Sequence, residues 1–82
     1  MMKVTVTFHS YFRELTGCSE VHEEVPEGTT FRELLARMHA QFPKLKTMER
    51  STLTAVGVEY ESGDYILQDG DEVSLFPPVQ GG

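Results

Sequence analysis

The chain lacks tryptophan and has a single cysteine, Cys18, among its 82 residues. One cysteine cannot form an internal disulfide, and this scarcity fits a reducing compartment. No apolar run approaches the roughly 20 residues of a membrane-spanning helix. The opening stretch, MMKVTVTFHS, alternates between apolar and polar residues, whereas a signal peptide would be continuously apolar. We therefore expect a cytoplasmic protein with no membrane partner.

Basic residues are also scarce, with seven Lys and Arg against thirteen Asp and Glu and a formal net charge of −6. Such an acidic surface repels the phosphates of nucleic acids and of anionic lipids. We therefore expect no nucleic-acid partner. A chain of this length buries roughly 60–65% of its unfolded surface, which allows one modest core but no deep active site. A large substrate pocket would have to be shared with a partner.

A recognisable catalytic or metal-binding motif is missing as well. His9, His22 and His39 fall on different predicted elements without the spacing of metal ligands. We interpret them as solvated surface residues and expect no metal site. Cys18 has no basic neighbour closer in sequence than Arg13, so it is interpreted as an inert small side chain.

The first 26 residues predict a strand, a short helix and a second strand. Residues 3–9 alternate strictly between apolar and polar side chains, which is typical of a half-buried strand. A short helix should follow, with Ser10 capping its free amides and Gly17 ending it in the left-handed conformation. Residues 21–25 have β-branched ends around two glutamates, which indicates an exposed edge strand that Pro26 ends.

The strongest helix signal covers residues 31–42, where apolar side chains recur at the spacing of one helical face. Thr30 and Glu33 match the S/T-x-x-E capping box at the start of this helix. Glu33 is also placed to pair with Arg37 one turn later. Pro43 should stop the helix.

The second half of the chain predicts strands at 53–56, 59–60 and 72–76, the first two joined by a tight turn at Gly57 and Val58. One amphipathic helix needs one apolar surface, so it should pack across a mixed sheet of four or five strands. A helix that links the second and third strands allows the first and last strands to lie parallel in the middle. The predicted fold class is α+β, in the β-grasp or ubiquitin-like arrangement.

We expect the domain to cover residues 1–76 and an extended tail to cover 77–82, within the closing stretch 76-FPPVQGG-82. The two prolines lack backbone donors, so the last strand must end there and the chain must leave the sheet. Six residues beyond Phe76 reach roughly 20 Å. Glycine has no Cβ, so the last two residues fit a channel too narrow for other residues. The tail is therefore interpreted as an arm that presents its carboxylate to another protein.

A carboxylate without a neighbouring side chain can be activated from outside. Joining it to a nucleotide phosphate at the expense of ATP makes an acyl-adenylate, which a thiol, a sulfide or an amine then displaces. The domain would act as a carrier that is not catalytic alone. This interpretation agrees with the missing triad and phosphate-binding loop.

The closing stretch 69-DGDEVSLFPPVQGG-82 resembles the signature end of the small subunit of molybdopterin synthase, the MoaD-like proteins of the ThiS/MoaD superfamily. The resemblance continues in 12-FRELTG-17, in 30-TFRELLARM-38 and in 55-AVGVEY-60, where that family commonly shows Ala-Val-Asn-x-Glu-Tyr. The tail is the specific part, because β-grasp sulfur carriers share the rest. Gly57 replaces the common asparagine, and both residues tolerate positive φ.

The resemblance implies that the carboxylate of Gly82 is adenylated by a partner enzyme (MoeB-like) and converted to a thiocarboxylate. Its sulfur would then go to a pterin precursor in the large subunit of molybdopterin synthase (MoaE-like), building the dithiolene of the molybdenum cofactor within a heterotetramer. By the same resemblance, the chain itself binds no cofactor, and ATP is used by the adenylating partner. The implied partner-binding residues are Phe76, Pro77, Pro78, Val79, Gln80 and Gly81.

Other functions remain open from the residues alone. The chain could carry sulfur for thiazole synthesis or tRNA thiolation, although Phe-Pro-Pro-Val before the glycines favours molybdopterin synthesis. It could be a ubiquitin-like modifier, in which an acceptor lysine displaces the activated glycine. It could also be a docking module with an inert tail.

Overall fold

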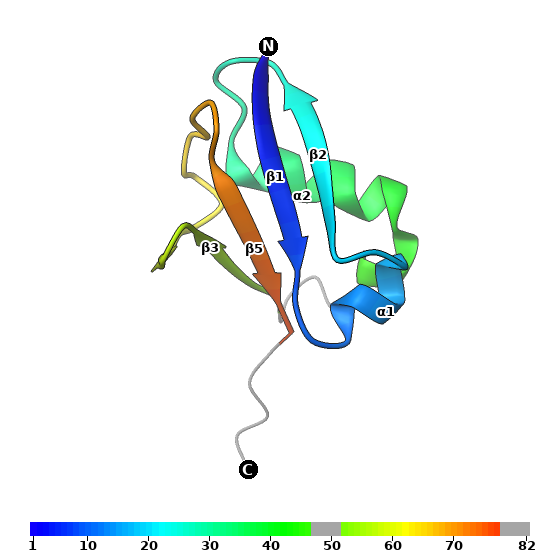
Figure 1. Ribbon diagram of the computed structural model, residues 1–82. Coiled ribbons are helices and arrows are strands. Elements are labelled where there is room, and N and C mark those ends of the chain that lie inside the picture. Colours follow the sequence, from blue (N-terminus) through cyan, green and yellow to red (C-terminus); the bar gives the residue numbers. More distant parts are fainter. Residues whose placement is uncertain (47–51, 78–82) are drawn as a thin grey trace.

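The computed structural model describes residues 1–46 and 52–77, and within them one long helix packs across a five-stranded sheet (Figure 1). The elements follow one another as β1 (Met2–Phe8), α1 (Phe12–Thr16), β2 (Glu20–Val25), α2 (Phe31–Gln41), β3 (Leu53–Val56), β4 (Glu59–Tyr60) and β5 (Glu72–Phe76). Every predicted strand and both predicted helices are present; the last three strands have the predicted bounds, and the bounds of the other elements differ by one or two residues. No helix in the described ranges has the length and apolar character needed to span a membrane.

The sheet is mixed, with the strand order β2-β1-β5-β3-β4. β1 and β5 run parallel in its centre, whereas the other neighbouring pairs are antiparallel (Figure 1). β2 lies at one edge, as its glutamates predicted. This arrangement confirms the β-grasp prediction, and it makes the strand that leads into the tail a central one.

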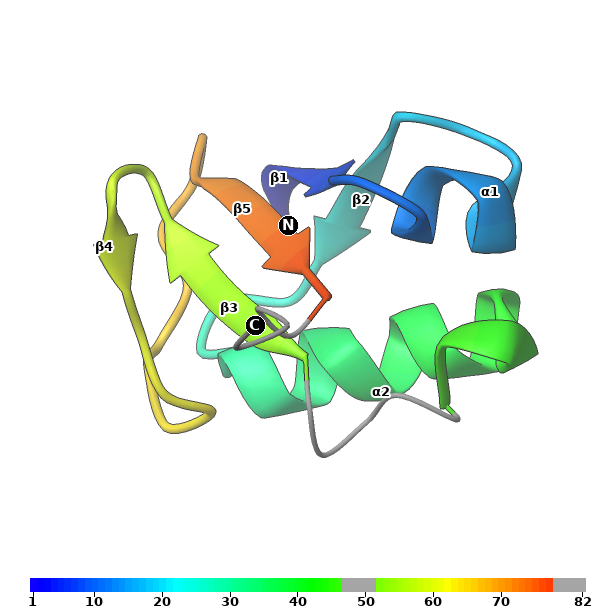
Figure 2. The same ribbon diagram turned by 90° about the horizontal axis from the view of Figure 1, so that it is seen from below.

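The core lies between α2 and one face of the sheet, which Figure 2 shows with α2 along that face. β1 contributes Val4, Val6 and Phe8, and each is at most 1% exposed. Burying a side chain of this kind stabilises the fold by about 1.5–3 kcal/mol. The other buried apolar residues of the cluster are Met2, Phe12, Val25, Phe31, Leu34, Met38, Leu45, Leu67, Val73 and Leu75.

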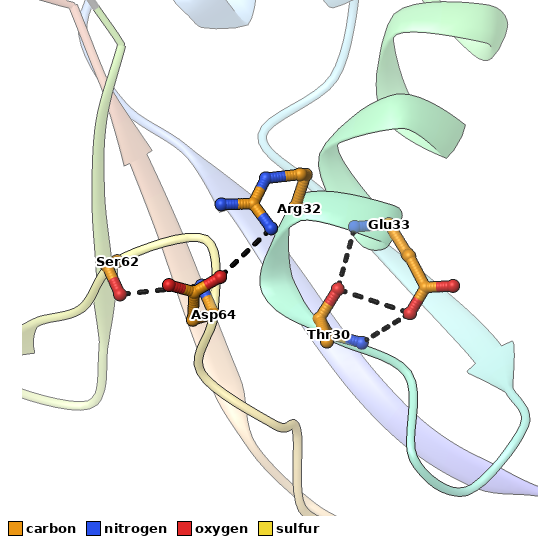
Figure 3. A network of polar contacts seen from close by, with 5 residues as sticks. All are labelled: Thr30, Arg32, Glu33, Ser62 and Asp64. Carbon is orange, nitrogen blue, oxygen red and sulfur yellow. Dashed lines mark hydrogen bonds and ion pairs between the residues drawn. The ribbon is translucent and has the colours of Figure 1, made fainter.

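The start of α2 is fixed by the predicted capping box (Figure 3). The Glu33 backbone N–H donates to the Thr30 hydroxyl at 3.3 Å, and the Thr30 backbone N–H donates to the Glu33 carboxylate at 2.9 Å. The backbone N–H of Thr30 and then its hydroxyl lower the pKa of Glu33, because both donate to the charged carboxylate. The box therefore satisfies two amides and favours the ionised glutamate.

A second anchor for α2 comes from the turn before Tyr65 (Figure 3). The first two helical amides, of Phe31 and Arg32, donate to the carbonyls of Tyr65 and Gly63 at 2.8 and 3.0 Å. The Arg32 guanidinium also donates to Asp64 at 3.0 Å. These bonds satisfy amides that a helix start leaves free, and they tie α2 to a loop far away in sequence.

Two predicted local contacts are wrong. Ser10 does not cap α1: it has a left-handed backbone with φ 57°, and Tyr11 is the N-cap without a side-chain bond. The predicted stop of α1 at Gly17, with φ 79°, is confirmed. Arg37 does not pair with Glu33. Its guanidinium instead lies 3.6 Å from the carboxylate of Glu23 in β2. The reason is that Thr30 already holds the Glu33 carboxylate at the helix start.

Candidate functional site: the root of the carboxyl-terminal tail

β5 carries the chain to its predicted tail along the middle of the sheet. Its register places Val73 and Leu75 in the core, as predicted, and leaves Ser74 and Phe76 on the outer face. Phe76 pairs with Leu53 of β3 at the end of the ladder. Because strands on both sides hold β5, the position of its last residue is tightly determined.

The entry to β5 is fixed by the turn Asp69-Gly70-Asp71. Asp69 accepts a hydrogen bond from the backbone of Lys3 at 2.9 Å, and the Gly70 N–H donates to the Lys3 carbonyl at 2.8 Å. Asp71 accepts hydrogen bonds from the Gln68 backbone at 2.8 Å and the Tyr65 hydroxyl at 3.0 Å. The carboxylates of Asp69 and Asp71 thus stabilise the turn by accepting hydrogen bonds. Partial burial and then the neighbouring Asp71 raise the pKa of Tyr65.

Three aromatic rings meet on the outer face where β5 ends, and we call them the tail-root cluster: His9, Tyr60 and Phe76. The His9 ring stacks on Phe76 with 4.3 Å between centroids and 15° between planes. The Tyr60 ring approaches Phe76 edge to face at 6.5 Å and 61°. The side chain of Tyr60 itself is open to solvent, with the residue 72% exposed. The cluster thus joins β4, β5 and the end of β1 around Phe76.

His9 corrects our interpretation of the histidines as solvated surface residues. It is half-buried, and its Nε2 atom is buried without a hydrogen-bond partner among the described residues. His22 fits the surface interpretation better: it is exposed, with Nδ1 3.2 Å from the Thr5 hydroxyl and Nε2 3.1 Å from Glu20. Within residues 1–46 and 52–77, no group of three His, Cys, Asp or Glu side chains is placed to hold a metal ion.

The structure places two of the predicted site residues, Phe76 and Pro77. Phe76 is half-buried in the tail-root cluster, and Pro77, also half-buried, follows it off the sheet. The other predicted site residues lie outside the described ranges: Pro78, Val79, Gln80, Gly81 and Gly82. Their roles, and the division into a domain and a tail, stay predictions.

Sequence reasoning missed His9 and Tyr60 as neighbours of Phe76. A signal for His9 was available, since it continues the polar side of the alternation in β1 and a parallel neighbour would bring it level with Phe76. Tyr60 needed the register between β3 and β4, where it pairs with Ala55. That register depends on tertiary packing, so local patterns do not give it.

Known proteins are similar to this chain in sequence and in fold. The model of the ThiS family matches residues 6–82. The "Molybdopterin synthase sulfur carrier subunit" of Escherichia coli is 36% identical over 96% of this chain and 99% of its own. The structure of a "Putative molybdopterin converting factor, subunit 1" from Pyrococcus furiosus superposes with a TM-score of 0.88 at 34% identity, over 96% of this chain and all of the other.

A third relative was solved together with another protein. It belongs to a complex of subunits 1 and 2 of molybdopterin-converting factor from Helicobacter pylori, and it matches with a TM-score of 0.73 and 27% identity over 99% of this chain and 100% of the other. The family match spans most of the chain, including the tail-root cluster and the residues after it. We conclude that this chain belongs to the ThiS family.

Proposed function

We propose that this protein is the sulfur carrier subunit of a molybdopterin synthase. The observation that supports this most directly is the end of β5: a central, doubly paired strand delivers Phe76 and Pro77 to the outer face, directly before Pro-Val-Gln-Gly-Gly in the sequence. Relatives that match nearly the whole chain bear the same name. The body of the protein is a rigid support, and the reacting group is the carboxylate of Gly82.

The proposed chemistry has two stages. In the first, the Gly82 carboxylate attacks the α-phosphorus of ATP in an adenylating partner, releasing pyrophosphate and leaving an acyl-adenylate. A sulfide-equivalent donor then attacks the acyl carbon, the bond to the phosphate oxygen breaks, and AMP leaves. The product is a thiocarboxylate. This chain supplies no base for these steps, and by our proposal it binds no cofactor of its own.

In the second stage the thiocarboxylate sulfur attacks a carbon of a pterin precursor held by the large subunit. As the carbon–sulfur bond forms, an oxygen leaving group departs from that carbon. Water then attacks the acyl carbon and the bond between the acyl carbon and sulfur breaks. The sulfur stays on the pterin as a thiolate, and the carboxylate of Gly82 is restored for another cycle. Two such transfers build a dithiolene. We propose that this exchange takes place in the cytoplasm, within a heterotetramer.

The tail-root cluster fits the docking step of this proposal. An exposed tyrosine beside a half-buried phenylalanine offers a partner apolar area at low conformational cost. The surrounding chain is acidic, with a net charge of −6. A basic rim on the partner would therefore speed the encounter, and the encounter rate should fall as salt is added.

Mass spectrometry tests the proposed function. The protein is incubated with an adenylating enzyme of the same family, ATP and a sulfide donor. We expect the mass to rise by the difference between sulfur and oxygen, and a variant that lacks Gly82 to stay unchanged. A covalent adduct with another protein would indicate a modifier instead. An unchanged mass of the wild-type chain would contradict both and leave a docking module.

A further inference from the structure

His9 is held by its backbone as well as by its ring. Its N–H donates to the Leu75 carbonyl at 3.1 Å, which adds a bond at the end of the ladder where Phe8 pairs with Leu75. The next residue, Ser10, has φ 57°, a left-handed conformation that serine adopts only at an energetic cost. The backbone is therefore strained at Ser10, directly after His9.

The His9 side chain carries a cost of its own. Its Nε2 is buried with no hydrogen-bond partner in residues 1–46 and 52–77, which destabilises the folded state relative to a solvated imidazole. The contact that offsets this cost is the stack on Phe76, at 4.3 Å and 15°. We therefore look for the role of His9 in its stack on Phe76.

Because of the prolines that follow it, a fixed position of Phe76 also restricts the direction of the backbone after Phe76. A residue before proline is restricted to extended backbone, and the proline ring fixes φ near its own value. The restriction applies to Phe76 through Pro77, and the sequence places another proline at 78. By stacking on Phe76, the His9 ring therefore helps to set the direction in which the chain leaves the sheet.

We propose that His9 is a positioning residue for sulfur transfer: by stacking on Phe76, it aims the proline-stiffened tail at the partner's active site. The inference rests on the proposed function, since only a tail that enters a partner needs to be aimed. His9 does not touch the reacting carboxyl group. Its loss should lower the fraction of bound complexes in which Gly82 reaches the reacting atoms, so kcat should fall while KM changes little.

The test compares three variants in the thiocarboxylation assay, at varied carrier concentration. His9→Ala removes the stack, His9→Phe keeps the stack and removes the nitrogen, and His22→Ala removes an exposed histidine elsewhere on the same face. We expect His9→Ala to lower kcat by about 2- to 10-fold, the range that one aromatic pair contributes. We expect His9→Phe to restore the rate, and His22→Ala to match the wild type. Circular dichroism verifies the fold of each variant.

The outcomes separate this inference from the proposed function. A wild-type chain that acquires no sulfur refutes the proposed function and the aiming role with it. If the wild type acquires sulfur, an unchanged rate in His9→Ala overturns the inference alone. So does a His9→Phe variant as slow as His9→Ala, because the nitrogen and not the stack would then matter. Should His9→Ala fail to fold, His9→Leu takes its place, because leucine also removes the aromatic stack on Phe76.

Discussion

Leu75 and Phe76 are neighbours in β5 whose side chains point to opposite faces of the sheet. Leu75 is 1% exposed and belongs to the core, whereas Phe76 belongs to the tail-root cluster on the outer face. Replacing each by alanine should therefore separate two properties. Leu75→Ala tests the stability of the body, and Phe76→Ala tests the presentation of the tail.

The magnitudes follow from what each side chain touches. A buried leucine replaced by alanine costs about 2–5 kcal/mol, because it loses its burial and leaves a cavity. For a domain of this size that lowers Tm by about 10–30 °C. Phe76 loses its contacts with His9 and Tyr60, which are worth about 0.5–1.5 kcal/mol each beyond area burial. If those contacts present the tail, kcat/KM for sulfur transfer falls by about 5- to 150-fold.

The assay measures both properties on the same samples. Urea unfolding gives the free energy of unfolding and the fraction of folded protein, and single-turnover sulfur transfer is then expressed per folded molecule. We expect Leu75→Ala to be the less stable variant with a near wild-type rate, and Phe76→Ala to be the slower variant. Equal loss of rate per folded molecule in both variants would refute the separation of the body from the tail root.

Three further predictions concern the cap of α2, the turn at Gly57 and the end of the chain. Thr30→Ala should cost about 1 kcal/mol in the free energy of unfolding. The pKa of Glu33 is lowered in the fold, so its carboxylate contributes to the free energy of unfolding above the usual glutamate pKa of about 4.3. This contribution is lost as the pH falls through the lower folded value. The difference in the free energy of unfolding between the wild type and Glu33→Gln should therefore become smaller as acid is added. Gly57 has φ 61°, so Gly57→Val should cost about 1–2 kcal/mol in thermal unfolding, and Gly57→Asn clearly less; equal losses would contradict the strain argument. Deleting Gly82 should abolish thiocarboxylate formation, seen by mass spectrometry, and leave Tm near the wild-type value; a large fall in Tm would make the tail structural.

The fold could be predicted because local signals agreed with each other. The alternation in β1, the capping box of Thr30 and Glu33, and the glycine stop at Gly17 each depend on residues close in sequence. The parallel pairing of β1 with β5 followed from the order of the elements and the single amphipathic helix. These features are properties of the backbone and of the hydrophobic pattern.

The site was predictable only in part, since its partners come from separate strands. Phe76 was identified from the sequence, but its stack on His9 depends on which residues of β1 and β5 lie level with one another. The wrong prediction for Arg37 has the same cause: residues one turn apart suggested Glu33, and tertiary packing offered Glu23 instead. Local rules indicate which side chains face outward, and register decides which of them meet.

The pairing of β5 up to Phe76 affects the affinity that a carrier of the proposed kind has for its partners. Ordering the backbone of one residue costs about 1–2 kcal/mol, and a partner that captures a carboxyl-terminal segment has to offset this for every residue that it orders. The body of this protein already places Phe76 and Pro77, because β5 is paired as far as Phe76. A partner is thereby spared about 2–4 kcal/mol, a factor of roughly 30 to 900 in affinity. Unpairing the end of β5 should therefore weaken docking at the proposed adenylating enzyme and at the proposed large subunit alike, whereas a substitution in one partner affects only that complex.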